Sequence, residues 1–364
     1  MEIGQKPNNF EELHCKFYEN KYMKFIHKAI IMLIAGSSIA SSELHAQHQQ
    51  NEPTVAIKPD QVVAVQLYDS KGKKITYAKM LNTIKKELKP NQITVVLYGE
   101  YHDNPIAHWL QYQTTSDLYQ TSQNMILGAE MFETNQQQAL NAYLLDPDTQ
   151  SNQGGMFGGG NDAYEKLKKS TQLWPNFKTD YKPLVDFAKD NNLPFIATNI
   201  PRKYARLMYK GGYKALDTLP LTEKTLFATT PFPYDSTLSC YAEISKAVGG
   251  HGMPATSNLA MSQAIKDATM ASETIKTFSQ LSANTSKGAP IFIHYNGCYH
   301  SDNHQSIEWY LNTYYKQNPM ATQWPLKIIT ISTRTQTDVT TFDKNNSNIA
   351  DFIIVTPESM TRTH

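Results

Sequence analysis

The sequence contains little cysteine, no dense run of basic residues, and no apolar stretch long enough to cross a bilayer. With 34 Lys and Arg against 33 Asp and Glu, the formal net charge is +1. This balance provides no long-range field that would gather nucleic acid. A spanning helix needs about 20 predominantly apolar residues, so we expect no transmembrane segment in the mature chain. The absences disfavour nucleic-acid binding and membrane insertion, whereas the 40% hydrophobic content is typical of a globular protein.

The first 46 residues are typical of an upstream segment followed by a secretory signal. A short basic segment begins at Met23 and precedes apolar residues 29–34 and small residues 35–40. Cleavage after Ala40 or Ala46 would fit this layout, and an uncleaved N-terminal anchor is the alternative. We therefore expect export to the periplasm or cell surface of a bacterium.

The three cysteines are compatible with export. Cys15 precedes the predicted signal, which leaves Cys240 and Cys298 in the mature chain. In an oxidising compartment these two could form a disulfide. Two separate buried thiols are the alternative, because the sequence does not give the distance between them.

Five apolar runs each end in polar residues and alternate with segments of helical periodicity. Residues 93–98 lead to Glu100 and His102, and residues 125–129 lead to Glu130. The remaining runs are residues 194–198, 290–294 and 326–331. This alternation predicts an α/β fold with a mostly parallel sheet flanked by helices. Ligands bind at the carboxyl ends of the strands in such sheets, so we expect the site there. Residues 62–68 and 74–76 predict an additional hairpin at an edge of the sheet.

Two segments between the strands are too long for simple connections. Residues 136–180 and 211–287 carry helical patterns, which predicts a small helical cap domain formed by these insertions. The α/β domain would then comprise residues 47–135, 181–210 and 288–364.

Several motifs follow one another along residues 92–311. In order they are Gly99-Glu-x-His102 with His108, Ala129-Glu130-Met-Phe132, Trp174, Asn199-Ile-Pro-Arg202, His251, Gln263 with Asp267-x-x-Met270-Ala271, and Asn296-Gly-x-x-His300. Together they resemble the ChaN-type haem-binding protein family, which is related to the Tiki metalloproteases and the erythromycin esterases. The resemblance implies a parallel α/β domain with a small helical domain, and a role in haem binding or iron uptake at the cell envelope. It often implies a lipid anchor too, but no Cys follows the apolar segment here, which favours a soluble exported form. A homodimer is compatible with the sequence, which does not decide the oligomeric state.

Four side chains at predicted strand ends could hold a divalent metal ion. They combine carboxylate oxygens with imidazole nitrogens, a donor set that suits such ions, and they match the acidic and histidine positions of the wider superfamily. A bound metal would lower the pKa of a water molecule for hydrolysis. The alternative is a satisfied polar cluster that orders the loops. These candidates for catalysis or metal binding are Glu100, His102, Glu130 and His300.

Haem binding requires different groups. It needs a broad apolar slot, an axial His or Tyr ligand, and cations for the propionates. The resemblance implies tyrosine ligation, for which the candidates by position are Tyr101, Tyr164, Tyr181 and Tyr299. His251, between two glycines, is the candidate for a second ligand, and Arg202 at a predicted helix start could hold a propionate. Pairing of Arg202 with Glu100 or Glu130 is the alternative.

The sequence thus favours an exported haem-binding protein rather than an enzyme, with haem as its cofactor. A metal-dependent hydrolase of the Tiki or erythromycin esterase type is the alternative, and a purely structural or partner-binding role is the third hypothesis.

Overall fold

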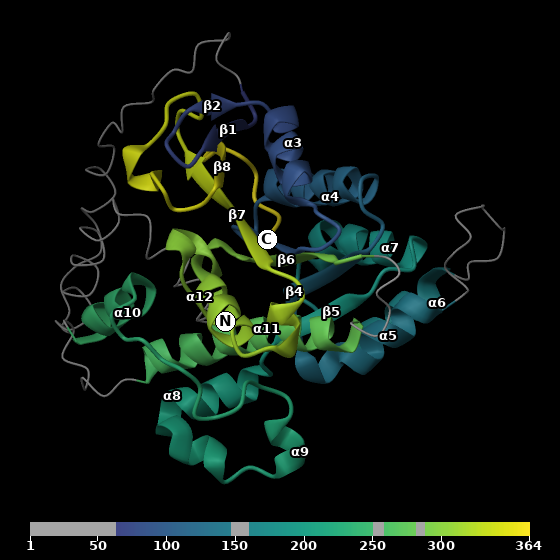
Figure 1. Cartoon of the computed structure of the whole chain (residues 1–364), viewed down its shortest axis with the longest axis vertical. Coiled ribbons are helices and arrows are strands. Elements are labelled where there is room, and N and C mark those ends of the chain that lie inside the picture. The colour runs from purple at the N-terminus through teal and green to yellow at the C-terminus, as the bar shows by residue number, and fades with distance from the viewer. Residues whose placement is uncertain (1–62, 147–159, 250–257, 282–287) are drawn as a thin grey trace, which may run out of the picture. The chain divides into compact units, whose positions relative to one another are not determined.

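The computed structural model describes residues 63–146, 160–249, 258–281 and 288–364 (Figure 1). The predicted signal and His251 lie outside the described residues. The chain divides into residues 1–62 and a compact unit formed by residues 63–364. In chain order the helices and strands of this second unit are β1 (Gln66–Asp69), β2 (Lys74–Ile75), α3 (Tyr77–Glu87), β3 (Ile93–Glu100), α4 (Pro105–Tyr119), β4 (Met125–Glu133), α5 (Gln137–Leu145), α6 (Gly160–Ser170), α7 (Lys182–Asp190), β5 (Phe195–Asn199), α8 (Arg202–Asp217), α9 (Leu221–Lys224), α10 (Ser239–Gly249), α11 (Leu259–Leu281), β6 (Ile291–Gly297), α12 (Ile307–Tyr315), β7 (Leu326–Gln336) and β8 (Phe352–Pro357).

The strands form one eight-stranded sheet in the order β2-β1-β8-β7-β3-β6-β4-β5. All neighbours from β8 to β5 are parallel, whereas β1 is antiparallel to both β8 and β2. The predicted α/β class, all five predicted strands and the edge hairpin are therefore confirmed. The parallel strand β8 was not predicted. Because six strands run the same way, their carboxyl ends lie along one edge of the sheet, here called the carboxyl edge.

Helices cover both faces of this sheet (Figure 1). Successive strand residues point to opposite faces, so Val96 and Tyr98 of β3 enter one core with residues of α3, α4, α5, α6 and α7. Val95 and Leu97 enter a second core with residues of α8, α10, α11 and α12. All eight residues of β3 are buried, which explains why the strand reads as a continuous apolar run rather than as an alternating one.

Helices from both predicted cap segments contribute to these two cores. Residues of α5 and α6 belong to the first core and residues of α8, α10 and α11 to the second. The division into an α/β domain and a helical cap domain stays a prediction. Cys240 and Cys298 are both buried free thiols, so the structure shows the second of the two alternatives for the cysteines.

Candidate functional site

The site begins where β3 ends. Glu100 is paired in register with Gly297, the last residue of the neighbouring strand β6. His102 follows two residues later, and its Nδ1 lies 3.0 Å from Oε1 of Glu100. The loop is short because Asn104 accepts a hydrogen bond from the amide of Ala107 and Pro105 occupies the first turn of α4. Residues two apart in an extended chain point the same way, which predicted that Glu100 and His102 would face the same space. The structure brings these two side chains into contact.

Glu100 is fully buried and lies at the centre of a hydrogen-bond network. Tyr181 donates its hydroxyl to Oε1 at 2.7 Å, and Gln111 donates its amide to Oε2. Nδ1 of His108 lies 3.5 Å from Oε2. Burial raises the pKa of Tyr181 well above its ordinary value, and the neighbouring charge of Glu100 raises it further. Tyr181 therefore stays a hydroxyl donor, which a buried carboxylate needs.

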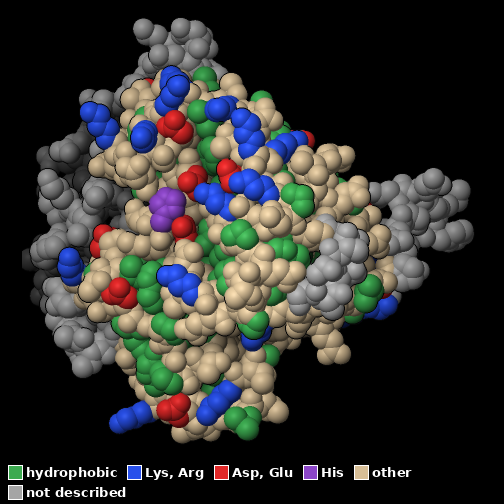
Figure 2. Space-filling model, viewed as in Figure 1, with side chains coloured by type: hydrophobic (Ala, Val, Ile, Leu, Met, Phe, Trp, Pro, Cys, Tyr) green, Lys and Arg blue, Asp and Glu red, His purple; other side chains and the backbone are tan. Residues whose placement is uncertain are grey.

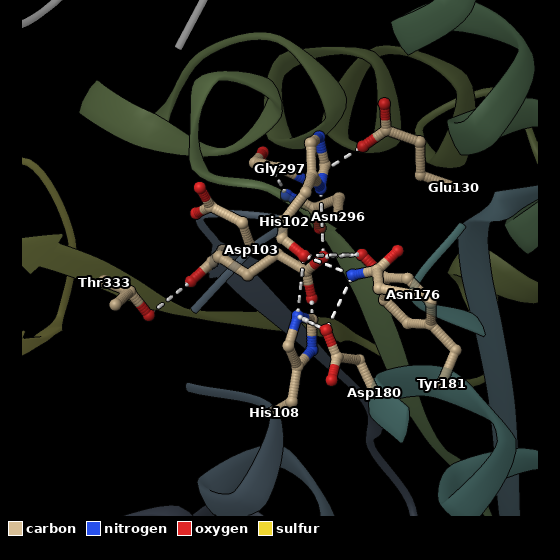
Figure 3. Close-up of polar contacts among 12 residues, drawn as sticks. His102, Asp103, His108, Glu130, Asn176, Asp180, Tyr181, Asn296, Gly297 and Thr333 are labelled. Carbon is tan, nitrogen blue, oxygen red and sulfur yellow. Dashed lines mark hydrogen bonds and ion pairs between the residues drawn. The ribbon is translucent and has the colours of Figure 1, made fainter. Parts of the chain in front are cut away.

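Two side chains, one from α4 and one from the segment between α6 and α7, hold the backbone of His102 (Figure 3). Its carbonyl oxygen accepts hydrogen bonds from Nδ2 of Asn176 at 2.6 Å and from Nε2 of His108 at 3.0 Å. The His102 ring meets Trp174 edge-on, with 4.7 Å between the ring centroids. The side chain is 16% exposed, so this imidazole is oriented from the core while a small part of it reaches the surface.

A second buried cluster lies behind Glu130, which is on β4. His300 stands between two carboxylates, with Nε2 at 3.3 Å from Glu130 and Nδ1 at 2.5 Å from Asp267 of α11. Tyr241 donates its hydroxyl to the other oxygen of Asp267 at 2.6 Å. Burial by itself would lower the pKa of His300, but the charges of Glu130 and Asp267 outweigh it and raise the pKa to about 10. Burial would likewise raise the pKa of Glu130, yet the charges of His300 and His102 hold it far below its ordinary value. His300 thus lies between two acidic side chains that favour its protonated form, while burial raises the pKa of Asp267 above its ordinary value.

The two clusters approach each other at Gly297. The backbone amide of Gly297 donates to Oε2 of Glu130 at 2.8 Å. A Cβ atom at this position would lie 3.0 Å from Nε2 of His102 and 3.6 Å from Oε2 of Glu130. A side chain at this position would therefore displace the His102 ring, which packs closely against the end of β6.

The four predicted metal ligands thus form two contacting pairs, Glu100 with His102 and Glu130 with His300. In the part of the chain that the structure describes, no group of three or more His, Cys, Asp or Glu side chains is arranged to hold a metal ion. Metal binding by these four residues stays a prediction.

The haem candidates are more dispersed. Tyr101, Tyr181 and Tyr299 are buried, and the hydroxyl of Tyr299 donates to the carbonyl of Cys240 at 2.6 Å. Tyr164 is the one of the four tyrosines that is partly exposed, and it stacks on Phe177. Arg202 is exposed at the start of α8, and its backbone amide donates to Oε1 of Glu133 at 3.0 Å. Pairing of its side chain with Glu100 or Glu130 stays a prediction.

Four residues of the site do not appear in the sequence analysis: Gln111, Asn176, Asp180 and Tyr241. Gln111 lies three residues after His108 on α4, a spacing that places both on one face and could have been noticed. Asn176 directly precedes a π-helix, Phe177–Tyr181, and Asp180 lies within it. Because π-helices are rare, we did not expect one here.

A cavity of about 200 Å³ lies at the opposite edge of the sheet, among residues that precede or begin β4, β5 and β6. It is smaller than the ~300–1,000 Å³ typical of pockets for drug-sized ligands. This cavity lies at the other end of the strands from the polar clusters, and its volume is too small to enclose a haem.

The fold and the site define an α/β protein whose carboxyl edge carries buried acid–histidine pairs. Residues 87–311, more than half of the chain, match the family described as "Haem-binding uptake, Tiki superfamily, ChaN". The chain belongs to this family, which confirms the resemblance seen in its motifs.

Among solved structures, the chain is similar to one entitled "Cofacial heme binding to ChaN of Campylobacter jejuni". The two share 17% identity with a TM-score of 0.49, and the match covers 80% of this chain and 97% of the other. No curated protein matches the chain. Among the described residues, no helix combines the length and apolar character needed to cross a membrane.

Proposed function

We propose that this chain binds haem at the carboxyl edge of its sheet, where His102 would be a ligand to the iron. Membership of the haem-binding family supports the ligand class, and the orientation of His102 supports the position. A histidine that ligates a metal commonly donates its other ring nitrogen to a carboxylate, which fixes the tautomer. Here Nδ1 of His102 contacts the buried Glu100, while Nε2 lies on the side of the ring toward Gly297.

Other residues of the chain offer two further features that haem needs. Trp174 and Tyr164 provide partly exposed aromatic surface on segments that pack together through Phe177 and Tyr181. Arg202 provides an exposed cation at the N-terminus of a helix, where negative groups such as propionates are favoured. Tyr164 and His251 are the candidates for a second ligand. When haem is bound, its iron would supply any redox chemistry, whereas the protein residues bind and orient the group.

The proposed role is haem or iron handling at the bacterial cell envelope, by an exported form of the chain. The basic and apolar layout of residues 23–40 supports export.

The direct test is titration of the purified protein with haem, followed by its Soret absorption. A stoichiometric, saturable shift is expected in the natural sequence, and His102→Ala should weaken binding and change the position of the band. His304→Ala is the matched control, because His304 also contacts a carboxylate, Glu308 at 2.9 Å, on an exposed surface. Absence of a saturable shift in the natural sequence would refute the proposal. Binding that is lost in Tyr164→Phe but not in His102→Ala would move the ligand to Tyr164.

A metal-dependent hydrolase is the second candidate, and one observation favours it. A nitrogen of His102 and an oxygen of Glu130 both approach the position next to Gly297, which brings two metal-compatible donors to one place. Stoichiometric metal in the purified protein, with loss of metal and hydrolysis in Glu100→Gln, would support this function. A metal-free and inactive protein would exclude it.

A further inference from the structure

Residues 358–364, here called the tail, follow β8 and return to the loop that carries His102. The amide of Glu358 still bonds to the carbonyl of Gln336, next to the end of β8. Four residues later, Nη1 of Arg362 contacts Oδ1 of Asp103 at 2.8 Å, and the amide of Thr363 donates to the carbonyl of Asp103 at 3.1 Å. The tail therefore holds the residue that directly follows His102.

The tail also contacts the support beneath His102. Thr363 donates its hydroxyl to Oδ2 of Asp180 at 2.6 Å. The same oxygen accepts from Nδ2 of Asn176 at 2.6 Å and lies 3.5 Å from Nε2 of His108. Asn176 and His108 both bond to the carbonyl oxygen of His102, which also accepts a longer hydrogen bond from the hydroxyl of Tyr181 at 3.4 Å. Asp180 is buried, so the hydroxyl of Thr363 supplies one of the hydrogen bonds that satisfy this carboxyl group.

Charged side chains lie near the tail. Lys and Arg side chains lie beside Asp and Glu in the part of the face where the C-terminus lies, with hydrophobic side chains next to them (Figures 1 and 2). Asp103 and Arg362 are each about one-third exposed, so their ion pair is open to solvent, unlike the contact with Asp180. A partly exposed pair can open and close more readily than a buried one.

We propose that the tail is a strap that positions the His102 loop and thereby regulates ligand affinity at the carboxyl edge. Arg362 and Thr363 are positioning residues: they touch Asp103 and Asp180 and act on His102 through them. With the strap closed, the His102 carbonyl and ring are held in place. With the strap released, the loop that includes residues 101–104 gains freedom and the site loses its preorganisation. The regulatory part of this proposal rests on the proposed haem function, but the mechanical part does not.

The mechanical part is tested in ligand-free protein by hydrogen exchange of the amides of residues 101–104. The double variant Arg362→Ala/Thr363→Val should exchange there several-fold faster than the natural sequence. Thr363→Ser keeps the hydroxyl and should behave like the natural sequence, as should Thr361→Ala, which changes an exposed tail residue. Unchanged exchange in the double variant would overturn the proposal, and so would an increase spread evenly over β3, β4 and β6.

The regulatory part is tested by haem titration of the same variants. Loss of groups that support a metal ligand commonly costs about 10–100-fold in affinity, and the double variant should lose at least about tenfold, with recovery in Thr363→Ser. Equal affinity in all variants would overturn the regulatory role. If the natural sequence binds no haem, the proposed function fails, and the exchange experiment still decides whether the tail acts as a strap.

Discussion

The substitution Asp267→Asn tests how much the buried contact between Asp267 and His300 contributes to stability. The carboxylate of Asp267 accepts from Nδ1 of His300 and from the hydroxyl of Tyr241, at 2.5 and 2.6 Å. An asparagine offers one oxygen and one NH₂ group, so one of the two donors would face another donor. Breaking a buried ion pair by removing one partner costs about 3–5 kcal/mol. Because His300 keeps Glu130 as a second carboxylate, we expect the lower end, about 3 kcal/mol.

Urea unfolding followed by tryptophan fluorescence measures this loss. At an m-value of about 3 kcal/mol/M, the midpoint should fall by roughly 1 M. Asp186→Asn is the matched control, since Asp186 likewise accepts from a tyrosine hydroxyl, Tyr143, and pairs with a basic side chain, Lys182, but is 36% exposed. Its loss should stay below about 1 kcal/mol, because solvent screens such a pair. Equal effects of the two substitutions would refute the claim that burial makes the His300 cluster strong.

Further predictions concern pH, close packing and the Glu100 network. The pKa of His300 is raised from 6.5 to about 10. The stability that protonated His300 contributes is therefore fully present below about pH 6.5 and is lost as pH rises through about 10. The urea midpoint should fall between about pH 7 and pH 10, and this fall should be smaller in His300→Gln. Gly297→Ala should weaken haem binding, because its Cβ would lie 2.9 Å from Cε1 of His102. In the control Gly128→Ala, the new Cβ would lie 2.6 Å from the ring of Phe292. This overpacking should reduce stability by about 1–3 kcal/mol without changing the haem affinity of the folded protein. Tyr181→Phe removes a donor from the buried Glu100 and should cost about 1–3 kcal/mol; no loss in thermal unfolding would mean that Gln111 and the histidines satisfy this carboxylate alone.

The strands of the sheet could be predicted because their physical cause is local. Buried parallel strands are continuous apolar runs. Strand β3 ends at Glu100, whereas β4 continues past Glu130 to Glu133. The hairpin of β1 and β2 was visible from its turn at residues 69–72. Strand β8 has the same apolar character, but it follows a long irregular segment after β7 rather than a helix, so the alternation that revealed the other strands did not extend to it.

The contacts within the site could be predicted only in part. The spacing of Glu100 and His102 already implied that they face the same space, since both lie near one strand end. That His300 would bridge Glu130 and Asp267 depends on the packing of α11 against the sheet, which no local pattern encodes. The support of His102 by Asn176 and Asp180 depends on a π-helix, and its connection to Thr363 spans 183 residues between Asp180 and Thr363. Such long-range contacts are set by tertiary packing and not by periodicity.

Haem binding through an imidazole oriented by Glu100 is tested by the absorption spectrum of the haem-titrated protein, compared among the natural sequence, His102→Ala and His304→Ala. We expect a saturable Soret shift at one stoichiometric ratio in the natural sequence. His102→Ala should alter the band and weaken binding, and His304→Ala should change neither. A natural sequence without a saturable shift, or a spectrum that His102→Ala leaves unchanged, would contradict haem binding through this imidazole.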